Sequence, residues 1–320
     1  MIINLISSIV IAHAAWEKLP PLPEPAAGFM AASVNGKIIV AGGTNWRDGN
    51  KRWLDTVWMF DPAKNEWSIG PALLHPVAYA GFADDGTRLY FAGGADGKQG
   101  RKEVYALDAT LKLTKIGSLP QPVVFGDAAI HDGVLRIFGG TPDPDDWAKV
   151  TTQMHAVKVA DGTTSMLASL KDLHGIGIPA VVAAGSSLYA FTGAWLNEKQ
   201  EVSNLAEAYA YDIASNAWRS LEPYPLAARA VFAVTLDGDH IYLAGGYGED
   251  FLSTAYIYHI STNRYTPSIP LPLAAGTCLV KCGEHVYLLG GEDQKKHRVD
   301  ACWRISVADL LATPGATAKP

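Results

Sequence analysis

Two charged residues near the end of the chain, Glu292 and Arg298, have types and a spacing that could do chemistry. Glu292 follows the pair Gly290-Gly291 directly, and Arg298 comes six residues later. A glutamate in a partly dry pocket can have its pKa raised toward neutrality and can then accept a proton. A guanidinium binds a carboxylate through a two-point fork that lysine does not reproduce. Brought together by the fold, the two groups could bind an anionic molecule and move a proton on it; as an exposed ion pair they would contribute only about 0–1 kcal/mol.

The elements that must position this pair are short strands. Residues 286–289 form an apolar run that is too short for a helix and rich in β-forming types. The surrounding pattern predicts, in chain order, a strand at 277–281, a turn at 282–285, a strand at 286–289, a polar loop at 292–298 and a third strand at 299–305.

The same unit recurs along the whole chain, marked by glycine doublets, with Thr192-Gly193 as a degenerate copy. The second residues of the doublets stand about 45–53 positions apart, near the roughly 50-residue period of kelch repeats. The spacing predicts an all-β fold, a six-bladed kelch-type β-propeller with four strands in each blade. We expect the doublets to be structural, because glycine allows positive φ and close backbone approach. The doublets are Gly42-Gly43, Gly93-Gly94, Gly139-Gly140, Gly245-Gly246 and Gly290-Gly291.

The last unit lacks a fourth strand, because the chain is nearly finished after Ile305. Three other outer strands, at 66–68, 217–219 and 264–266, contain an aromatic residue and are followed by proline, and residues 16–20 (WEKLP) show the same pattern. We therefore expect residues 16–19 to supply the outer strand of the last blade and close the ring, which leaves only short, protected edges. The expected organisation is a leader at 1–14, a single propeller at 15–310 and a flexible tail at 311–320.

Composition narrows the possible partners and cofactors. The 320 residues carry a net charge of −6, and no run of Lys and Arg is present, so nucleic acid is not an expected partner. We expect the three cysteines, Cys278, Cys282 and Cys302, to be small buried hydrophobic residues. No CxxC or His-x-x-x-His spacing indicates a structural metal, and no cofactor is expected.

The first 14 residues are apolar and end in Ala12-His13-Ala14, which resembles a signal-peptide cleavage site. No Lys or Arg precedes Lys18, so the positive start of an ordinary signal peptide is missing. The leader predicts a periplasmic or secreted protein; the alternative is a cytoplasmic protein with a disordered or mis-started leader. The run is too short for a membrane span, and no other segment is long enough.

The loops between the second and third strands of the six blades should surround the mouth of the central channel and form a concave site. Glu292 and Arg298 would lie there with a set of polar and aromatic residues that we expect to bind a ligand. This set is Asn45, Trp46, Arg47, Trp195 and Arg229.

The six kelch-type units and the segment GGEDQKKHRVDA, residues 290–301, resemble the N-acetylneuraminate mutarotases (sialic acid epimerases). The resemblance places Glu292 at the family's catalytic glutamate and Arg298 at its active-site arginine, with the same Asp300-Ala301 afterwards. The unit at 28–43 stands first in this chain but late in the family's bacterial prototype. The chain therefore resembles a circularly permuted branch of that family.

The resemblance implies an isomerase that interconverts anomers of N-acetylneuraminate or a related sugar by general acid–base ring opening and closing. Its partner would be a small sugar, and it would need no cofactor. The alternative is a non-catalytic kelch-repeat scaffold that binds protein or glycan, because a repeat defines a fold and not a function. A copper radical oxidase on the same fold is disfavoured, since the cysteines lie within or next to predicted strands and the histidines are scattered.

Overall fold

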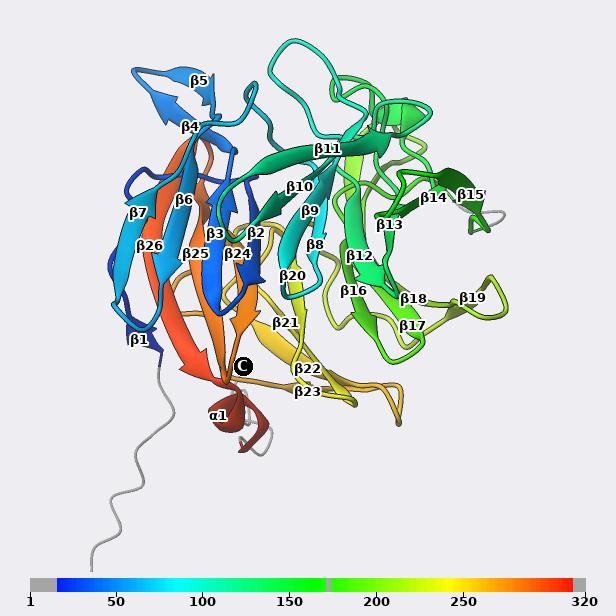
Figure 1. Cartoon of the computed structure of the whole chain (residues 1–320). Coiled ribbons are helices and arrows are strands. Elements are labelled where there is room, and N and C mark those ends of the chain that lie inside the picture. The colour runs from blue at the N-terminus through cyan, green and yellow to red at the C-terminus, as the bar shows by residue number, and fades with distance from the viewer. Residues whose placement is uncertain (1–15, 171–173, 313–320) are drawn as a thin grey trace, which may run out of the picture.

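Six four-stranded antiparallel sheets surround a central axis as the blades of a β-propeller (Figure 1). The computed structural model describes residues 16–170 and 174–312. The leader predicted at 1–14 and all but two residues of the predicted tail lie outside these ranges. Between each pair of neighbouring blades, a cluster of buried apolar side chains lets the facing sheets exclude water. The predicted fold class is confirmed.

The strands of the first three blades run outward from the axis in chain order. Blade one contains β2 (Met30–Val34), β3 (Lys37–Ala41), β6 (Val57–Asp61) and β7 (Glu66–Ile69). Blade two contains β8 (Gly81–Asp84), β9 (Arg88–Ala92), β10 (Glu103–Asp108) and β11 (Leu113–Ser118). Blade three contains β12 (Asp127–His131), β13 (Val134–Phe138), β14 (Met154–Lys158) and β15 (Thr164–Leu167).

The remaining blades follow the same order, except that the last one takes its outer strand from the other end of the chain. Blade four contains β16 (Ala180–Ala184), β17 (Ser187–Leu196), β18 (Val202–Asp212) and β19 (Ala217–Ser220). Blade five contains β20 (Phe232–Thr235), β21 (His240–Ala244), β22 (Ala255–His259) and β23 (Arg264–Pro267). Blade six contains β24 (Gly276–Cys282), β25 (His285–Gln294), β26 (His297–Ser306) and β1 (Glu17–Lys18).

The N-terminal strand closes the ring as predicted. β1 pairs antiparallel with β26, with Glu17 opposite Arg304. The Arg304 guanidinium donates to both carboxylate oxygens of Glu17, from Nε at 2.7 Å and from Nη2 at 2.9 Å. The Leu19 amide extends the pairing to the Cys302 carbonyl at 2.9 Å, and the Leu19 side chain is buried. Closure therefore joins an edge ion pair to a buried apolar anchor.

The glycine doublets have the structural role expected of them. Gly42 and Gly43 both have positive φ, 68° and 104°. A Cβ on Gly42 would lie 2.1 Å from the carbonyl oxygen of Val77, in the segment that enters the next blade. In the degenerate copy, Thr192 takes a φ of 57°. The doublet is thus the point where one blade touches the backbone leading into its neighbour.

The loops expected at the mouth are more ordered than the sequence pattern predicts. Residues 292–298 are a continuation of the β25–β26 hairpin, with Glu292 opposite Arg298 and a turn at Lys295 and Lys296. Long strand extensions also replace the loop expected between β17 and β18. In blade one, β4 (Thr44–Arg47) and β5 (Asn50–Trp53) form a separate hairpin above the sheet (Figure 1).

Few residues adopt helical structure. A 3-10 turn, η1 (Trp147–Lys149), lies in the third mouth connection, and α1 (Val307–Ala312) buries Val307 and Leu310 after β26. Leu311 and Ala312, expected to begin the flexible tail, belong to this helix. No helix of the described residues is both long and apolar enough to cross a membrane. All three cysteines are free and buried, as predicted.

Candidate functional site

All six blades contribute to a cavity of about 480 Å³ at the mouth of the central channel. Arg229, Glu292 and Arg298 line it, so the structure brings together three of the predicted site residues. Most of the remaining lining is aromatic or small and apolar. Lining residues from every blade place the cavity on the axis, and Glu292, Lys295 and Arg298 of the β25–β26 hairpin place it at the end where that hairpin extends. Figure 1 shows the hairpins that rise at this end of the ring.

Residues with a left-handed backbone conformation form the rim of this cavity, and we call them the belt. The residue two positions before the inner strand has positive φ in five blades, at Gly28, Tyr79, Phe125, Ile178 and Ala230. The Tyr79 amide donates to the Gly28 carbonyl at 2.8 Å, and the Phe125 amide donates to the Tyr79 carbonyl at 3.1 Å. The Ile178 amide donates in turn to the Phe125 carbonyl at 2.6 Å. Bulky residues rarely adopt positive φ, and such strain is concentrated at functional sites.

Glu292 and Arg298 form an ion pair across the β25–β26 hairpin. Arg298 Nη1 lies 2.5 Å from Glu292 Oε1, and the Lys296 amide donates to the same oxygen at 3.1 Å. Arg298 Nη2 donates to Thr44 Oγ1 at 3.3 Å, which ties the hairpin to blade one. The Arg298 side chain is only 6% exposed, and its Nε has no hydrogen-bond partner among the described residues. Arg298 also lines the mouth cavity.

Arg229 offers a second guanidinium to the cavity. Its Cζ lies 4.5 Å above the ring of Tyr247, and its Nη1 donates to the side-chain oxygen of Asn204 at 2.7 Å. Burial lowers the pKa of Arg229, although a guanidinium stays charged in proteins. Among the described residues, no carboxylate forms a salt bridge with Arg229 or Lys295, so the mouth has uncompensated positive charge.

Asp127 lies at the waist of the channel. A second cavity of about 330 Å³ continues along the inner strands and shares Asp127, Phe82 and Phe232 with the mouth cavity. The Asp127 carboxylate accepts the Val181 amide and the Ala128 amide, each at 2.8 Å. Burial nevertheless raises the pKa of Asp127 to about 7. Asp127 therefore adds less negative charge near neutral pH than an exposed aspartate would.

Three of the predicted binding residues lie on the β4–β5 hairpin and do not line the cavity. Asn45 is buried, and its amide donates to Glu24 Oε1 at 2.8 Å. The Trp46 ring lies under Lys296, with the ammonium 5.1 Å from the ring centroid. Arg47 is exposed at the end of β4. The hairpin packs against blade six instead of turning inward, which explains why these side chains miss the channel.

The fourth predicted residue outside the cavity is Trp195 in blade four. It stacks on His174, with ring centroids 4.0 Å apart, and packs against the apolar cluster between blades three and four. The extension of β17 carries Trp195 up the hairpin and away from the axis.

Sequence reasoning missed three aromatic residues near the rim, Trp53, Tyr79 and Phe125. Four rings follow one another across the first three blades with centroids 5.1–5.8 Å apart: Trp53, Tyr79, Phe125 and Trp147. All four are half-buried. We call them the aromatic row. The sequence offers little that would identify the row, because the one shared feature of Tyr79 and Phe125 is a position shortly before an inner strand.

Comparison with known proteins identifies the repeat. The Kelch motif family model matches residues 25–74 and 228–268. Kelch-like protein 25 of Xenopus tropicalis is 25% identical over 285 residues, which cover 87% of this chain and 39% of that protein. Kelch-like protein terF of Aspergillus terreus is 25% identical over 76% of this chain and 54% of its own length. Beta-scruin of Limulus polyphemus is 24% identical over 51% of this chain and 19% of its own length.

The chain forms a six-bladed propeller, two parts of it match the Kelch motif, and the relatives are kelch-like proteins and scruins, so the findings support kelch-type repeats. The chain spans about two-fifths of the length of the kelch-like protein 25 relatives. Neither the family match nor the relatives support the resemblance to mutarotases or a circular permutation.

Two predictions are corrected by these comparisons. The prediction of an isomerase is wrong, because the relatives are kelch-like proteins and scruins, and none of those reported bears the name of an enzyme. The prediction of a small sugar as partner is wrong on the same ground. In the structure, Glu292 and Arg298 form an ion pair with each other.

Proposed function

We propose that this chain is a non-catalytic kelch-repeat scaffold that binds a protein partner at the mouth of its channel. The observation that carries the proposal is the composition of the rim, where Tyr79 and Phe125 of the aromatic row line one cavity with Arg229, Lys295 and Arg298. Aromatic residues and arginine are the types most enriched at the centres of protein interfaces. The kelch-like and scruin relatives support a scaffold rather than an enzyme.

The chemistry of the mouth indicates what the partner presents. Arg229 and Lys295 have no carboxylate partner among the described residues, and Arg298 Nε is a buried donor without an acceptor. A buried unpaired donor is unfavourable, so a ligand acceptor placed there would be favoured. We infer that the partner inserts a loop or chain end with an aspartate or glutamate side chain, flanked by apolar residues that cover the aromatic row.

The rigidity of the rim favours this mode of binding. The belt residues are held by hydrogen bonds that run from blade to blade, so little conformational entropy is lost when a partner binds. Tyr79 and Phe125 line the cavity and provide apolar contact area, and the cavity gives depth for one or two side chains.

A displayed library of random peptides, selected on the purified chain, tests the proposal. We expect enriched peptides that contain Asp or Glu, with affinities measured by fluorescence anisotropy. Arg229→Met should weaken them about tenfold or more, because a hydrogen bond to a charged group contributes about 1.5–3 kcal/mol.

Arg264→Met is the matched control, since Arg264 lies exposed at the other end of the same blade. Enriched peptides that bind wild type, Arg229→Met and Arg264→Met equally would contradict the proposal, as would a selection that enriches none. Thermal unfolding of both variants checks that each folds.

A further inference from the structure

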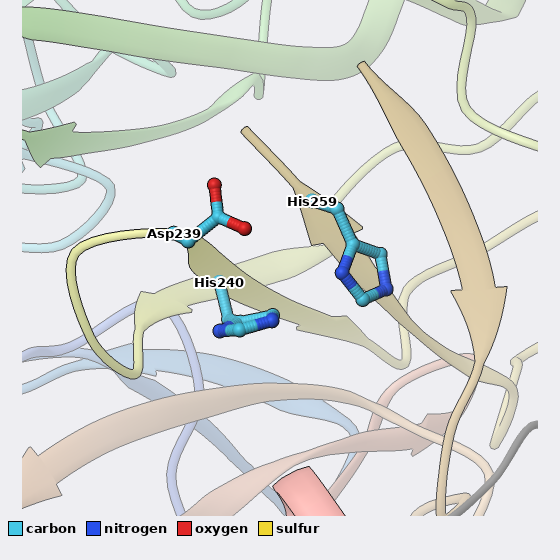
Figure 2. Close-up of side chains that lie close together, drawn as sticks. All are labelled: Asp239, His240 and His259. Atoms are coloured by element: carbon cyan, nitrogen blue, oxygen red, sulfur yellow. The ribbon is translucent and has the colours of Figure 1, made fainter. Parts of the chain in front are cut away.

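Three potential metal ligands meet at the end of blade five opposite the mouth. His240 begins β21 and His259 ends β22, and the two residues are direct partners across the sheet. Asp239 immediately precedes His240. One ligand atom from each of the three side chains lies within 4.8 Å of the other two. Figure 2 shows the two imidazole rings and the carboxylate gathered at the end of these strands.

Each ligand is oriented by a partner outside the set. His240 Nδ1 lies 2.8 Å and 3.0 Å from the two carboxylate oxygens of Asp237, which leaves Nε2 for an ion. His259 Nε2 lies 2.9 Å from Thr266 Oγ1, which leaves Nδ1. A second group that holds the other ring nitrogen is the usual companion of a metal-binding histidine.

The third ligand, Asp239, is also fixed in place. Its Oδ1 accepts the Ser261 amide at 2.7 Å, and its Oδ2 accepts the Ser261 hydroxyl at 2.9 Å. Each carboxylate oxygen retains a lone pair for a cation. Among the described residues, no lysine or arginine forms a salt bridge with Asp237 or Asp239 that would compete with a metal ion.

We propose that Asp239, His240 and His259 form a binding site for Zn²⁺ or a similar divalent transition-metal ion. Two imidazole nitrogens and one carboxylate oxygen suit zinc, whereas Mg²⁺ and Ca²⁺ prefer oxygen ligands. Ligands of a tetrahedral zinc at about 2.0–2.1 Å lie about 3.3 Å apart, so ligand atoms now within 4.8 Å of one another must approach by up to about 1.5 Å. All three are half-buried at the surface, which leaves room for this movement and for water as a fourth ligand.

The bound ion would join the turn between β20 and β21 to the end of β22. The site is separate from the mouth, so it does not depend on the proposed scaffold function. Sequence spacing does not reveal it, because His240 and His259 are far apart in the chain and adjacent only in the sheet.

Zinc titration of the tag-free chain, with a competing chromophoric chelator, tests the site. We expect saturable uptake at this site, with an affinity that falls about tenfold or more in His259→Gln and in His240→Gln. His131→Gln is the matched control. His131 ends β12 at the equivalent turn of blade three and lies 3.2 Å from Asp132, in a pair without a third ligand. That variant should bind zinc as wild type does.

A second readout separates binding from folding. Zinc should raise the thermal midpoint of the wild type and of His131→Gln but not of His259→Gln, because an ion that binds only the folded chain stabilises it. Should His259→Gln fail to fold, Asp239→Asn replaces it. Unchanged zinc affinity in the folded ligand variants, or no saturable uptake by the wild type, would overturn the proposal.

Discussion

The two ends of the ring reverse the chain in different ways. At the end opposite the mouth, β2 and β3 are joined by Asn35 and Gly36, both with positive φ, and β12 and β13 by Asp132 and Gly133 in the same manner. Asn-Gly and Asp-Gly are the residues that such two-residue hairpin turns prefer. At the mouth, positive φ falls instead on residues such as Tyr79 and Phe125, which have no local preference for it.

The difference shows where local sequence determines the backbone and where packing determines it. At the end opposite the mouth, the turn residues themselves favour the positive φ that the turns require. The mouth belt is held by hydrogen bonds between neighbouring blades, so its geometry exists only in the assembled ring. A strained conformation that persists only because its surroundings hold it is common at binding sites, and here it coincides with the cavity.

The largest expected effect is the loss of stability in Gly42→Ala, at the mouth end of blade one. Gly36→Ala, at the opposite end of the same blade, is its comparison. Gly42→Ala should lower the free energy of unfolding by about 3–5 kcal/mol, because it adds left-handed strain and a clash with the Val77 carbonyl. Gly36→Ala has nothing within 4 Å of the new Cβ, so it should lower the free energy of unfolding by only about 1–2 kcal/mol, from left-handed strain alone. Urea unfolding measures both, and equal losses would show that contact with the next blade is unimportant.

Asp127, at the waist between the two ends, should make stability depend on pH. Burial raises its pKa in the folded chain to about 7, against about 3.9 when unfolded. Between these values the folded chain holds a proton that the unfolded chain has lost. The contribution of this group to the free energy of unfolding therefore falls as pH rises from about 4 to 7, by at most about 1.4 kcal/mol per unit, and is flat above.

Asp127→Asn should remove this slope, and urea unfolding at several pH values compares it with the wild type. Because Asn lacks the second acceptor oxygen, one of the two amide bonds is lost at every pH, which lowers the whole curve without tilting it. A variant curve with the same slope as that of the wild type would show that another group titrates.

Tyr79→Ala should weaken a selected peptide about 30-fold, because central aromatic residues of an interface contribute about 2 kcal/mol or more. Tyr79 contacts Trp53 and Phe125 in the aromatic row. Ile69→Ala is a control on the outer strand β7, where the side chain is 69% exposed, and should leave affinity unchanged. Fluorescence anisotropy gives both values, and similar losses would mean that the peptide does not use the mouth.

The smallest expected effect concerns the closing ion pair. The hydrogen bond from Arg304 holds the pKa of Glu17 below its usual value, so the pair stabilises the fold above the pKa of the unfolded glutamate and is lost as pH falls through the folded one. Because the Glu17 side chain is 59% exposed, Arg304→Ala should lose less than about 1 kcal/mol at neutral pH. The difference from wild type should shrink in acid; a difference that persists at low pH would point to lost packing of the Arg304 stem.

Much of the fold follows from the sequence, because its signals are local and repeated. The glycine doublets gave the number of blades, and the Trp-Glu-Lys-Leu-Pro segment gave the closing strand, which pairs with β26. The hairpin at 292–298 was expected as a loop, since its polar residues carry no strand pattern. Cross-strand pairing of Glu292 with Arg298 overrides that weak preference.

Less of the candidate site than of the fold could be predicted from the sequence. Arg229, Glu292 and Arg298 were placed at the mouth correctly, because charged residues near strand ends mark the channel. Tyr79 and Phe125 of the aromatic row were missed, since they look like ordinary core residues until neighbouring blades turn them toward the axis. The function inferred from Glu292 and Arg298 was wrong because spacing shows that two groups can meet but not that they neutralise each other.

A crystal structure of the chain with a selected peptide tests the central claim most directly. The account predicts a peptide carboxylate within hydrogen-bond distance of Arg229 or Arg298 Nε, and apolar peptide side chains against Tyr79 and Phe125. A peptide seated on the outer strands, or on the turns at the opposite end, with the mouth cavity empty, would contradict it.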